Sequence, residues 1–393
     1  MDQEYPLPEV KEEKAQERIR RRRELFKGAN APMDLPFAAL VVLLSCIGLI
    51  MMFSASYASA SYEENDPAYF LVRQGPYMLL GLPLMYLISR VNYQYFRALS
   101  VPAMIIAVVL LMLVPFIGVK VNGARRWLII FGISVQPSEI AKIAMILLFA
   151  AIISKNYKVM KTFRHGILPF AAILAMLLGL LYLQPHLSGM VLIAAVGAVL
   201  LFLGGVRLRY YLAAAGLIVP LAIFVVNTME HAKQRIAVWR DPWIAPRGAG
   251  YQAIQSLLAI GSGGLFGLGL GQSRQKYLYL PEGHNDFVFA IVAEELGLFG
   301  AGIVLLLFAI LIIRGYWIAL HAPDRFGSLM VAGITTLLAI QVFLNVAVVS
   351  NLIPVTGISM PFFSYGGSAL LIQLVEMGVV LSVSRQISAG KSV

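Results

Sequence analysis

The chain has 393 residues, of which 59% are hydrophobic and only 13% charged, and its mean hydropathy is +0.80. A water-soluble domain carries about 25% charged residues, so this composition excludes an ordinary soluble protein. The net charge is +11, but the densest basic run, Arg18 to Arg23, directly precedes an apolar stretch and contains no aromatic residues. Such a run is typical of a membrane-topology signal, not of nucleic-acid binding.

Residues 1–34 are charged and are predicted to form a cytoplasmic tail. Apolar segments close to the length that crosses a bilayer, roughly 20 residues, then recur along the chain. They lie at 35–56, 74–89, 99–118, 137–154, 166–183, 187–204, 209–227, 287–313, 327–350 and 363–384. The pattern predicts an all-α polytopic membrane protein with about ten transmembrane helices, forming one domain over 35–385, with a short cytoplasmic tail at 386–393.

Most connections between the predicted helices are short, but a polar stretch rich in Gly, Pro and Trp, 228–286, separates helices 7 and 8. Lysines and arginines of the short connections fall almost entirely on the side that carries both termini. Because cytoplasmic loops are enriched in these residues, both termini are predicted to be cytoplasmic and the long loop extracytoplasmic. Arg125 and Arg126 are exceptions on the outer side. They are either tolerated interfacial residues or an anion site, since the arginine fork suits phosphate.

Ionisable residues within the predicted spans suggest a polar interior, because charged groups rarely face lipid. Glu139 and Lys142 are three residues apart at the start of the fourth span, where they share a helix face and can pair. They either form a structural ion pair or bind a charged headgroup. Glu294 and Glu295 in the eighth span and Glu376 in the tenth add further carboxylates, which we expect around a central polar cavity.

The long loop contains two further segments of interest. Residues 250–260 are amphipathic and are expected to lie along the membrane surface. The glycine-rich run 261–271 lacks the context of a nucleotide-binding motif and is expected to form a re-entrant or tightly turning backbone. Asp286 follows at the mouth of the eighth span, where it is either a helix N-cap or a carboxylate with a raised pKa suited to act as a general base. His284 and Asp286 do not by themselves make a zinc site.

Four separated motifs, in the right order, resemble the SEDS proteins (FtsW, RodA and SpoVE). They are Gly123–Trp127 (GARRW), Gln136–Lys142 (QPSEIAK), Arg274–Asp286 (RQKYLYLPEGHND) and Leu352–Ser368 (LIPVTGISMPFFSYGGS). The last is more similar to FtsW and SpoVE than to RodA. At Gly283 and Ala293 this chain has a different small residue from the one usual in the family, and these two exchanges put little of the resemblance in doubt.

The resemblance implies a peptidoglycan glycosyltransferase that polymerises lipid II at the outer face of the bacterial cytoplasmic membrane, for septal cell-wall synthesis. It places the family's essential acidic residue at Asp286 and an important tryptophan at Trp127. Asp286 is then the candidate catalytic base. The candidate substrate-binding residues are Arg125, Arg126, Trp127, Glu139, Lys142, Lys276, Glu282 and His284.

The resemblance also implies partners: lipid II as substrate, a class B penicillin-binding protein transpeptidase, and other proteins of the division machinery. The sequence requires no cofactor and contains no dedicated metal site, although Mg²⁺ or Mn²⁺ is able to assist at the diphosphate. Two alternatives stay open at this point. One is a flippase that carries the lipid-linked precursor across the bilayer, and the other is a non-catalytic scaffold for cell division.

Overall fold

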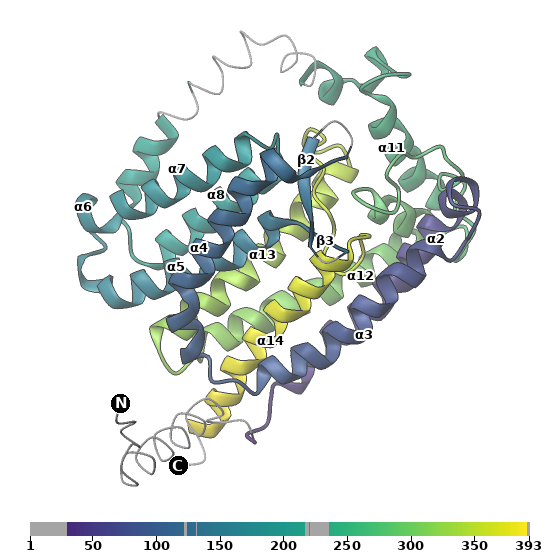
Figure 1. The fold of residues 1–393 in the computed structure, drawn as a ribbon. Coiled ribbons are helices and arrows are strands. Elements are labelled where there is room, and N and C mark those ends of the chain that lie inside the picture. The colour runs from purple at the N-terminus through teal and green to yellow at the C-terminus, as the bar shows by residue number, and fades with distance from the viewer. Residues whose placement is uncertain (1–29, 122–123, 131, 217–219, 221–235, 391–393) are drawn as a thin grey trace, which may run out of the picture.

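The computed structural model describes residues 30–390 except 122–123, 131, 217–219 and 221–235. It is a bundle of α-helices with a small β-sheet at one end (Figure 1). In the first half of the chain the elements are α2 (Leu35–Glu63), α3 (Tyr69–Ser89), α4 (Gln94–Ile117), β1 (Val119–Val121), β2 (Ala124–Ile130), β3 (Ile133–Val135), α5 (Pro137–Asn156), η1 (Tyr157–Val159), α6 (Phe163–Gly166), α7 (Leu168–Tyr182) and α8 (Leu187–Leu203). In the second half they are η2 (Pro242–Ile244), α11 (Tyr251–Gly263), α12 (Val288–Leu320), α13 (Arg325–Val349) and α14 (Gly367–Gly390).

Among the described residues, six helices are long and apolar enough to cross a membrane: α2, α4, α5, α12, α13 and α14. The span of α5 is Pro137–Val159 and that of α14 is Gly367–Ile387. The helices α7 and α8 are apolar but shorter. In the described part of the chain a helix overlaps every predicted span; of the seventh, 209–227, residues 209–216 and 220 are helical and the others lie outside the described residues. The multi-pass helical architecture is therefore confirmed. Of the predicted terminal tails, 1–29 and 391–393 lie outside the described residues, and α14 continues through 386–390.

The β-sheet between α4 and α5 corrects the prediction of a purely helical chain. Strand β2 pairs antiparallel with β1 and with β3, so the sheet order is β1-β2-β3. Two of the strands have only three residues, too short for an alternating pattern to stand out in the sequence. In this connection the backbone amides and carbonyls of the strands pair with one another, which leaves few polar groups unsatisfied at the surface of the bundle.

The bundle has two chemically different ends. At the first, the N-termini of α5, α8, α12 and α14 gather near the sheet; we call this the sheet end. At the opposite end the start of α2 lies beside the end of α14, because the Asp34 amide donates to Ser384 Oγ (3.2 Å). That second end also carries ion pairs, such as the half-buried Arg314–Asp34 at 2.9 Å and the more exposed Arg97–Asp324 at 3.0 Å.

Helix α12 is broken at Gly297, which has φ 69° and ψ −172°. The glycine-rich loop after α11 fills the break and satisfies its backbone groups. Leu268 N and Gly269 N donate to the carbonyls of residues 294 and 295 (both 3.0 Å), and the amides of residues 298 and 299 donate to those of 264 and 265 (2.9 and 3.1 Å). A Cβ at Gly267 would lie 2.1 Å from a backbone oxygen of α12. Glycine is required for this close approach, so of the two predicted possibilities, a re-entrant or a tightly turning backbone, the tight turn is confirmed.

Candidate active site at the sheet end

Asp286 lies in the turn that leads into α12, and its backbone is held from two sides. Asn345 Nδ2 of α13 donates to the Asp286 carbonyl (2.8 Å) and to the Ile358 carbonyl (2.7 Å). The next residue, Phe287, is only 1% exposed, so its ring anchors the turn in the hydrophobic core. Asp286 is not the N-cap of α12, which is Phe287. Its half-buried carboxylate is therefore not used to cap the helix.

The surroundings of Asp286 raise its pKa to about 6. Burial is the main cause, because it penalises the charged form, and the negative charge of Glu282 adds to it. The positive charge of Arg126 acts in the opposite direction. A carboxyl group with a pKa near 6 is mostly ionised at neutral pH yet still basic enough to accept a proton in a reaction.

The two arginines of strand β2 contact different parts of the bundle, and the β1–β2 register shifts between the pairs of Arg125 and Trp127. Arg125 is exposed and donates to the carbonyls of Pro115 (2.8 Å) and Phe116 (3.3 Å) at the end of α4. Arg126 donates to the Pro185 carbonyl (2.5 Å), before α8, and interacts electrostatically with Asp286. Trp127 is half-buried and is opposite Val119 of β1, after a register shift that separates it from the Arg125–Lys120 pair. Of these three predicted site residues, Arg126 is the one that faces Asp286.

Lys142 and Glu139 form a buried ion pair in the first turns of α5, with 2.7 Å between Lys142 Nζ and Glu139 Oε2. Glu376 of α14 interacts electrostatically with both. The predicted pair therefore exists, and it lies next to a second acidic side chain, Glu376. Because its ammonium is already paired with the Glu139 carboxylate, Lys142 contributes fixed polarity below the site more than free positive charge.

His186, the N-cap of α8, interacts electrostatically with both Arg126 and Lys142. It was not predicted as a site residue. Its pKa is lowered to about 3, first by burial and then by the positive charges of Arg126 and Lys142. The imidazole is therefore neutral, and its Nδ1 is buried and has no hydrogen-bond partner among the described residues. The same residues offer no partner to Arg126 Nε, which is also buried. Unsatisfied buried polar atoms are uncommon in native proteins. These two belong to residues that interact electrostatically, and they mark a place where a polar ligand or water completes the structure.

Gly357 closes the site from the loop between α13 and α14. Its φ is +70°, and a Cβ at this position would lie 3.0 Å from Asp286 Oδ2. Ser188, the second residue of α8, donates to the carbonyls of Thr356 and Gly357, in the latter case at 3.0 Å. The PVTG run was noticed in the sequence, but its proximity to Asp286 was not predicted.

The predicted residues His284 and Glu282 lie in the same turn as Asp286. His284 stacks on Phe70 of α3, with ring centroids 4.4 Å apart, and burial lowers its pKa. Glu282 adopts a positive φ of 55° and accepts a hydrogen bond from Asn285 Nδ2. The negative charge of Glu282 reaches Asp286, so this side chain tunes the candidate base from the solvent side.

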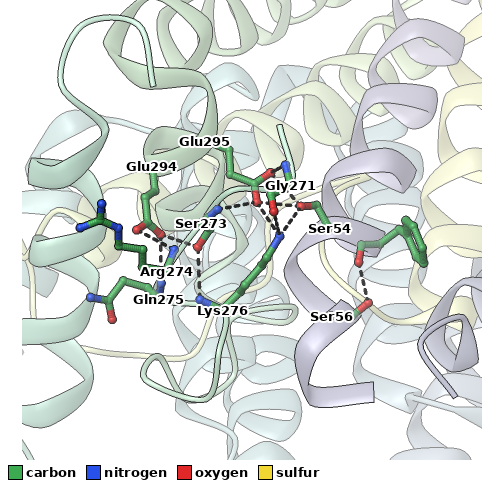
Figure 2. A network of polar contacts seen from close by, with 10 residues as sticks. Ser54, Ser56, Gly271, Ser273, Arg274, Gln275, Lys276, Glu294 and Glu295 are labelled. Atoms are coloured by element: carbon green, nitrogen blue, oxygen red, sulfur yellow. Dashed lines mark hydrogen bonds and ion pairs between the residues drawn. The ribbon is translucent and has the colours of Figure 1, made fainter. Parts of the chain in front are cut away.

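Lys276 lies elsewhere, in a buried network with two glutamates of α12 (Figure 2). Its Nζ donates to Glu295 Oε1 (3.1 Å), to the Gly271 carbonyl (2.6 Å) and to Ser54 Oγ of α2 (3.3 Å). Glu295 also accepts from Ser54 Oγ at 2.7 Å. Lys276 is 5% exposed, so the structure places it in a polar clasp between the loop and two helices, not beside Asp286.

Glu294 belongs to the same clasp. It accepts hydrogen bonds from the backbone amides of Arg274 (3.1 Å) and Gln275 (3.3 Å) and from Ser273 Oγ. The expectation that Glu294 and Glu295 share one cavity with Glu376 is therefore wrong: the first two hold a turn of the long loop, whereas Glu376 faces Lys142. Charged side chains inside a membrane protein usually pair with one another or with backbone groups.

Among the described residues, no group of three or more His, Cys, Asp or Glu side chains is close enough to hold a metal ion. Mg²⁺ is commonly held by one or two carboxylates together with substrate phosphates. The single carboxylate of Asp286 fits such an arrangement. A dedicated metal cage is therefore not part of the described site, and we derive no reaction step from a metal.

Comparison with known proteins adds independent evidence. Residues 35–389 match the family of cell cycle proteins that contains FtsW, RodA and SpoVE. The chain is 41% identical over 353 residues to the probable peptidoglycan glycosyltransferase FtsW of Geobacter metallireducens, covering 89% of this chain and 94% of that protein. It is 43% identical over 356 residues to the stage V sporulation protein E of Bacillus subtilis, covering 90% and 97%.

Two solved structures are similar throughout. One comes from a study of how a peptidoglycan synthase complex coordinates polymerization and crosslinking; it has a TM-score of 0.76 and 30% identity, covering 91% of this chain and 98% of that one. The other is the rod shape determining protein RodA of Thermus thermophilus, with a TM-score of 0.66 and 30% identity, covering 90% and 97%. The order of the motifs, the helical bundle and these matches agree, and the chain belongs to the FtsW/RodA/SpoVE family of cell cycle proteins.

Proposed function

We propose that this protein is a peptidoglycan glycosyltransferase that polymerises lipid II, with Asp286 as its general base. The observation that supports this most strongly is the setting of Asp286: a half-buried carboxylate with a pKa of about 6, held by backbone contacts beside an arginine. The relatives named as probable peptidoglycan glycosyltransferases provide the reaction class. The site provides the chemical groups which that reaction needs.

The reaction forms one glycosidic bond and breaks one bond to phosphate. The hydroxyl oxygen of the acceptor sugar attacks the anomeric carbon of the donor, while the bond from that carbon to the lipid diphosphate breaks and the diphosphate leaves with the electron pair. Asp286 accepts the hydroxyl proton as the new bond forms, which is the role of a general base. Direct attack opposite the leaving group inverts the configuration at the anomeric carbon.

Negative charge grows on the diphosphate as it leaves, and fixed positive groups stabilise it. Arg126 is the cation that interacts with Asp286, so we assign it to the donor diphosphate. The N-termini of α5, α8, α12 and α14 gather at the same end of the bundle, and the positive ends of their helix dipoles favour an anion there. A divalent cation bound to the diphosphate would add to this charge without needing a protein cage.

We place the sheet end outside the cytoplasm and the opposite end inside. The opposite end carries Arg97, Arg314, Arg325 and Arg385, together with the cationic segment 155–164, and cytoplasmic faces are enriched in such residues. In this orientation both termini are cytoplasmic, and Asp286 is accessible to precursors that have reached the outer leaflet. About ten spans, with the seventh in 209–227, complete this topology.

A class B penicillin-binding protein is the partner we propose, since a similar structure comes from a peptidoglycan synthase complex that couples polymerization to crosslinking. The FtsW relatives favour a role at the division septum among other division proteins. The similarity to a stage V sporulation protein makes sporulation the second candidate process, with the same chemistry.

The test uses purified protein with its transpeptidase partner in liposomes that contain labelled lipid II. Glycan strands are separated by gel electrophoresis, and the lipid II in each leaflet is measured separately. Our proposal predicts strands made from outward-facing lipid II with no change in the leaflet distribution. Movement of lipid II between leaflets without strands would instead establish the flippase alternative, and neither activity in a complex that binds lipid II would favour the scaffold.

A further inference from the structure

A second cationic patch lies near the turn of Asp286 and is not used by the mechanism above. It consists of Tyr69, Arg73 and Tyr77 on α3 and Tyr365 before α14, and we call it the Arg73 patch. The guanidinium carbon of Arg73 lies 4.0 Å from the centre of the Tyr69 ring, and Arg73 hydrogen-bonds to the Tyr365 hydroxyl. The Arg73 side chain is exposed. Within the described residues no carboxylate forms an ion pair with it, so most of its five donors face outward.

The patch is rigid because the face of α3 that carries it is fixed to the start of α14. Gln74 Nε2 donates to the Ser364 carbonyl (3.3 Å), and the Gly366 amide donates to Gln74 Oε1 (2.9 Å). A Cβ on Gly367 would lie 2.2 Å from the Tyr77 ring, which shows how closely this ring packs on the turn. An arginine on a fixed platform loses little freedom when it binds a ligand, and this improves binding.

The same turn connects the patch to the catalytic residue. The Tyr365 amide donates to the His284 carbonyl (2.9 Å), and Ser364 Oγ donates to the Asn285 carbonyl (2.6 Å). Phe70 stacks between the two parts, with its ring centre 4.4 Å from His284 and 4.8 Å from Tyr365. The Arg73 patch and Asp286 are thus held by consecutive residues of one turn, although the charges that shift the pKa of Asp286 come from Glu282 and Arg126.

The chemistry of the patch suits a phosphate group of a lipid. The planar guanidinium binds phosphate with two parallel hydrogen bonds, and the tyrosine hydroxyls add donors. On the outer side of the same helix Val72 is 64% exposed, Leu79 74% and Leu80 67%. A lipid-linked diphosphate bound at Arg73 would therefore have an apolar helix surface beside it for its hydrocarbon chain.

We propose that the Arg73 patch binds the diphosphate of the acceptor lipid II, the second of the two lipid-linked substrates. This rests on the proposed function, because only a polymerase brings two such lipids together. The donor diphosphate must lie at the reacting carbon and thus near Arg126 and Asp286. The acceptor presents its sugar hydroxyl to Asp286 across the rest of its disaccharide, so its diphosphate needs a separate cation farther away, and Arg73 meets this requirement.

The test compares Arg73→Gln with Arg90→Gln as a matched control. Arg90 follows the other end of α3 and forms the same kind of contact, with its guanidinium carbon 4.9 Å from the Tyr86 ring centre and a hydrogen bond of 2.7 Å to the Tyr86 hydroxyl. The donor is lipid II with its acceptor hydroxyl methylated, supplied in excess so that it serves only as donor. Unmodified lipid II is then varied as the acceptor, and the initial rate of lipid-linked tetrasaccharide formation is measured in neutral detergent.

We expect Arg73→Gln to raise the acceptor KM about tenfold or more, the effect of losing a charge-assisted hydrogen bond, with kcat and the donor KM nearly unchanged. Arg73→Lys should lie between this variant and the wild type, and Arg90→Gln should match the wild type. An unchanged acceptor KM, or a loss confined to kcat, would refute the assignment.

Two further outcomes are distinguishable. If the defect of Arg73→Gln appears only in vesicles with anionic phospholipid and not in neutral detergent, the patch binds a phospholipid headgroup and the proposal is wrong. If the wild type makes no tetrasaccharide although it binds both lipids, the proposed polymerase function itself fails, independently of Arg73.

Discussion

The contact between Gly357 and Asp286 allows a sharp test of the site by substitution with a single methyl group. In Gly357→Ala the new Cβ would lie 3.0 Å from Asp286 Oδ2, against about 3.4 Å or more for an ordinary contact, so the carboxylate must shift by a few tenths of an ångström. A misplacement of about 1 Å costs roughly 100-fold in rate. Scaled in free energy, this shift corresponds to a loss of roughly four- to tenfold in kcat, on the order of 1 kcal/mol.

The substitution also strains the backbone, because Gly357 has a φ of +70° and alanine in that region costs about 1–2 kcal/mol. Gly132→Ala controls for this strain. Gly132 has a φ of +79°, and its added Cβ meets nothing within 4 Å. Both variants should lose similar thermal stability in detergent, whereas only Gly357→Ala should lose polymerisation of fluorescent lipid II. Equal activity of the two folded variants would show that the position of the Asp286 carboxylate does not limit the reaction.

Three further predictions follow from the charges of the site and of the clasp. Because Asp286 must be ionised to act as a base, kcat/KM should fall as pH drops through about 6, and a rate that is level down to pH 5 would remove it from that role. Arg126 lowers the pKa of Asp286, so Arg126→Gln should move this acidic limb to higher pH, in addition to slowing the reaction; a limb that stays in place would contradict their coupling. Lys276→Met leaves Glu295 as an unpaired buried carboxylate and should cost about 3–5 kcal/mol of stability, partly recovered in the double variant with Glu295→Gln; thermal unfolding checks this, and equal stability of the single variant and the wild type would refute the clasp.

The sequence predicted the helices well because their signal is local. A run of about twenty apolar residues must cross the bilayer as a helix, and this held for the described spans irrespective of what each helix contacts. The glycine run 261–271 was also interpreted correctly, since glycine is needed wherever two backbones approach closely. The strands β1 and β3 were missed because a three-residue strand has no period to detect, and the seven-residue β2 between them was missed as well.

The site was predicted less completely because contacts between distant segments leave no trace in a single sequence. Lys276 lies only ten positions from Asp286, yet its side chain turns to Glu295 and Ser54. His186 and Gly357 are 100 and 71 positions from Asp286 by their numbers, and the fold brings both into the site. Charge and motif identified the candidate base, but the side chains around it depend on how the helices pack.

The central claim is that Asp286 removes the acceptor proton, and Asp286→Asn tests it most directly. This variant keeps the size of the side chain and cannot act as a base, while Glu282→Gln changes a neighbouring carboxylate of the same turn. Each is purified with the transpeptidase partner, shown to be folded by thermal unfolding and to bind lipid II, and assayed for glycan strands. We predict no strands from Asp286→Asn and continued polymerisation by Glu282→Gln. Strands made by folded Asp286→Asn at the rate of the wild type would contradict the account.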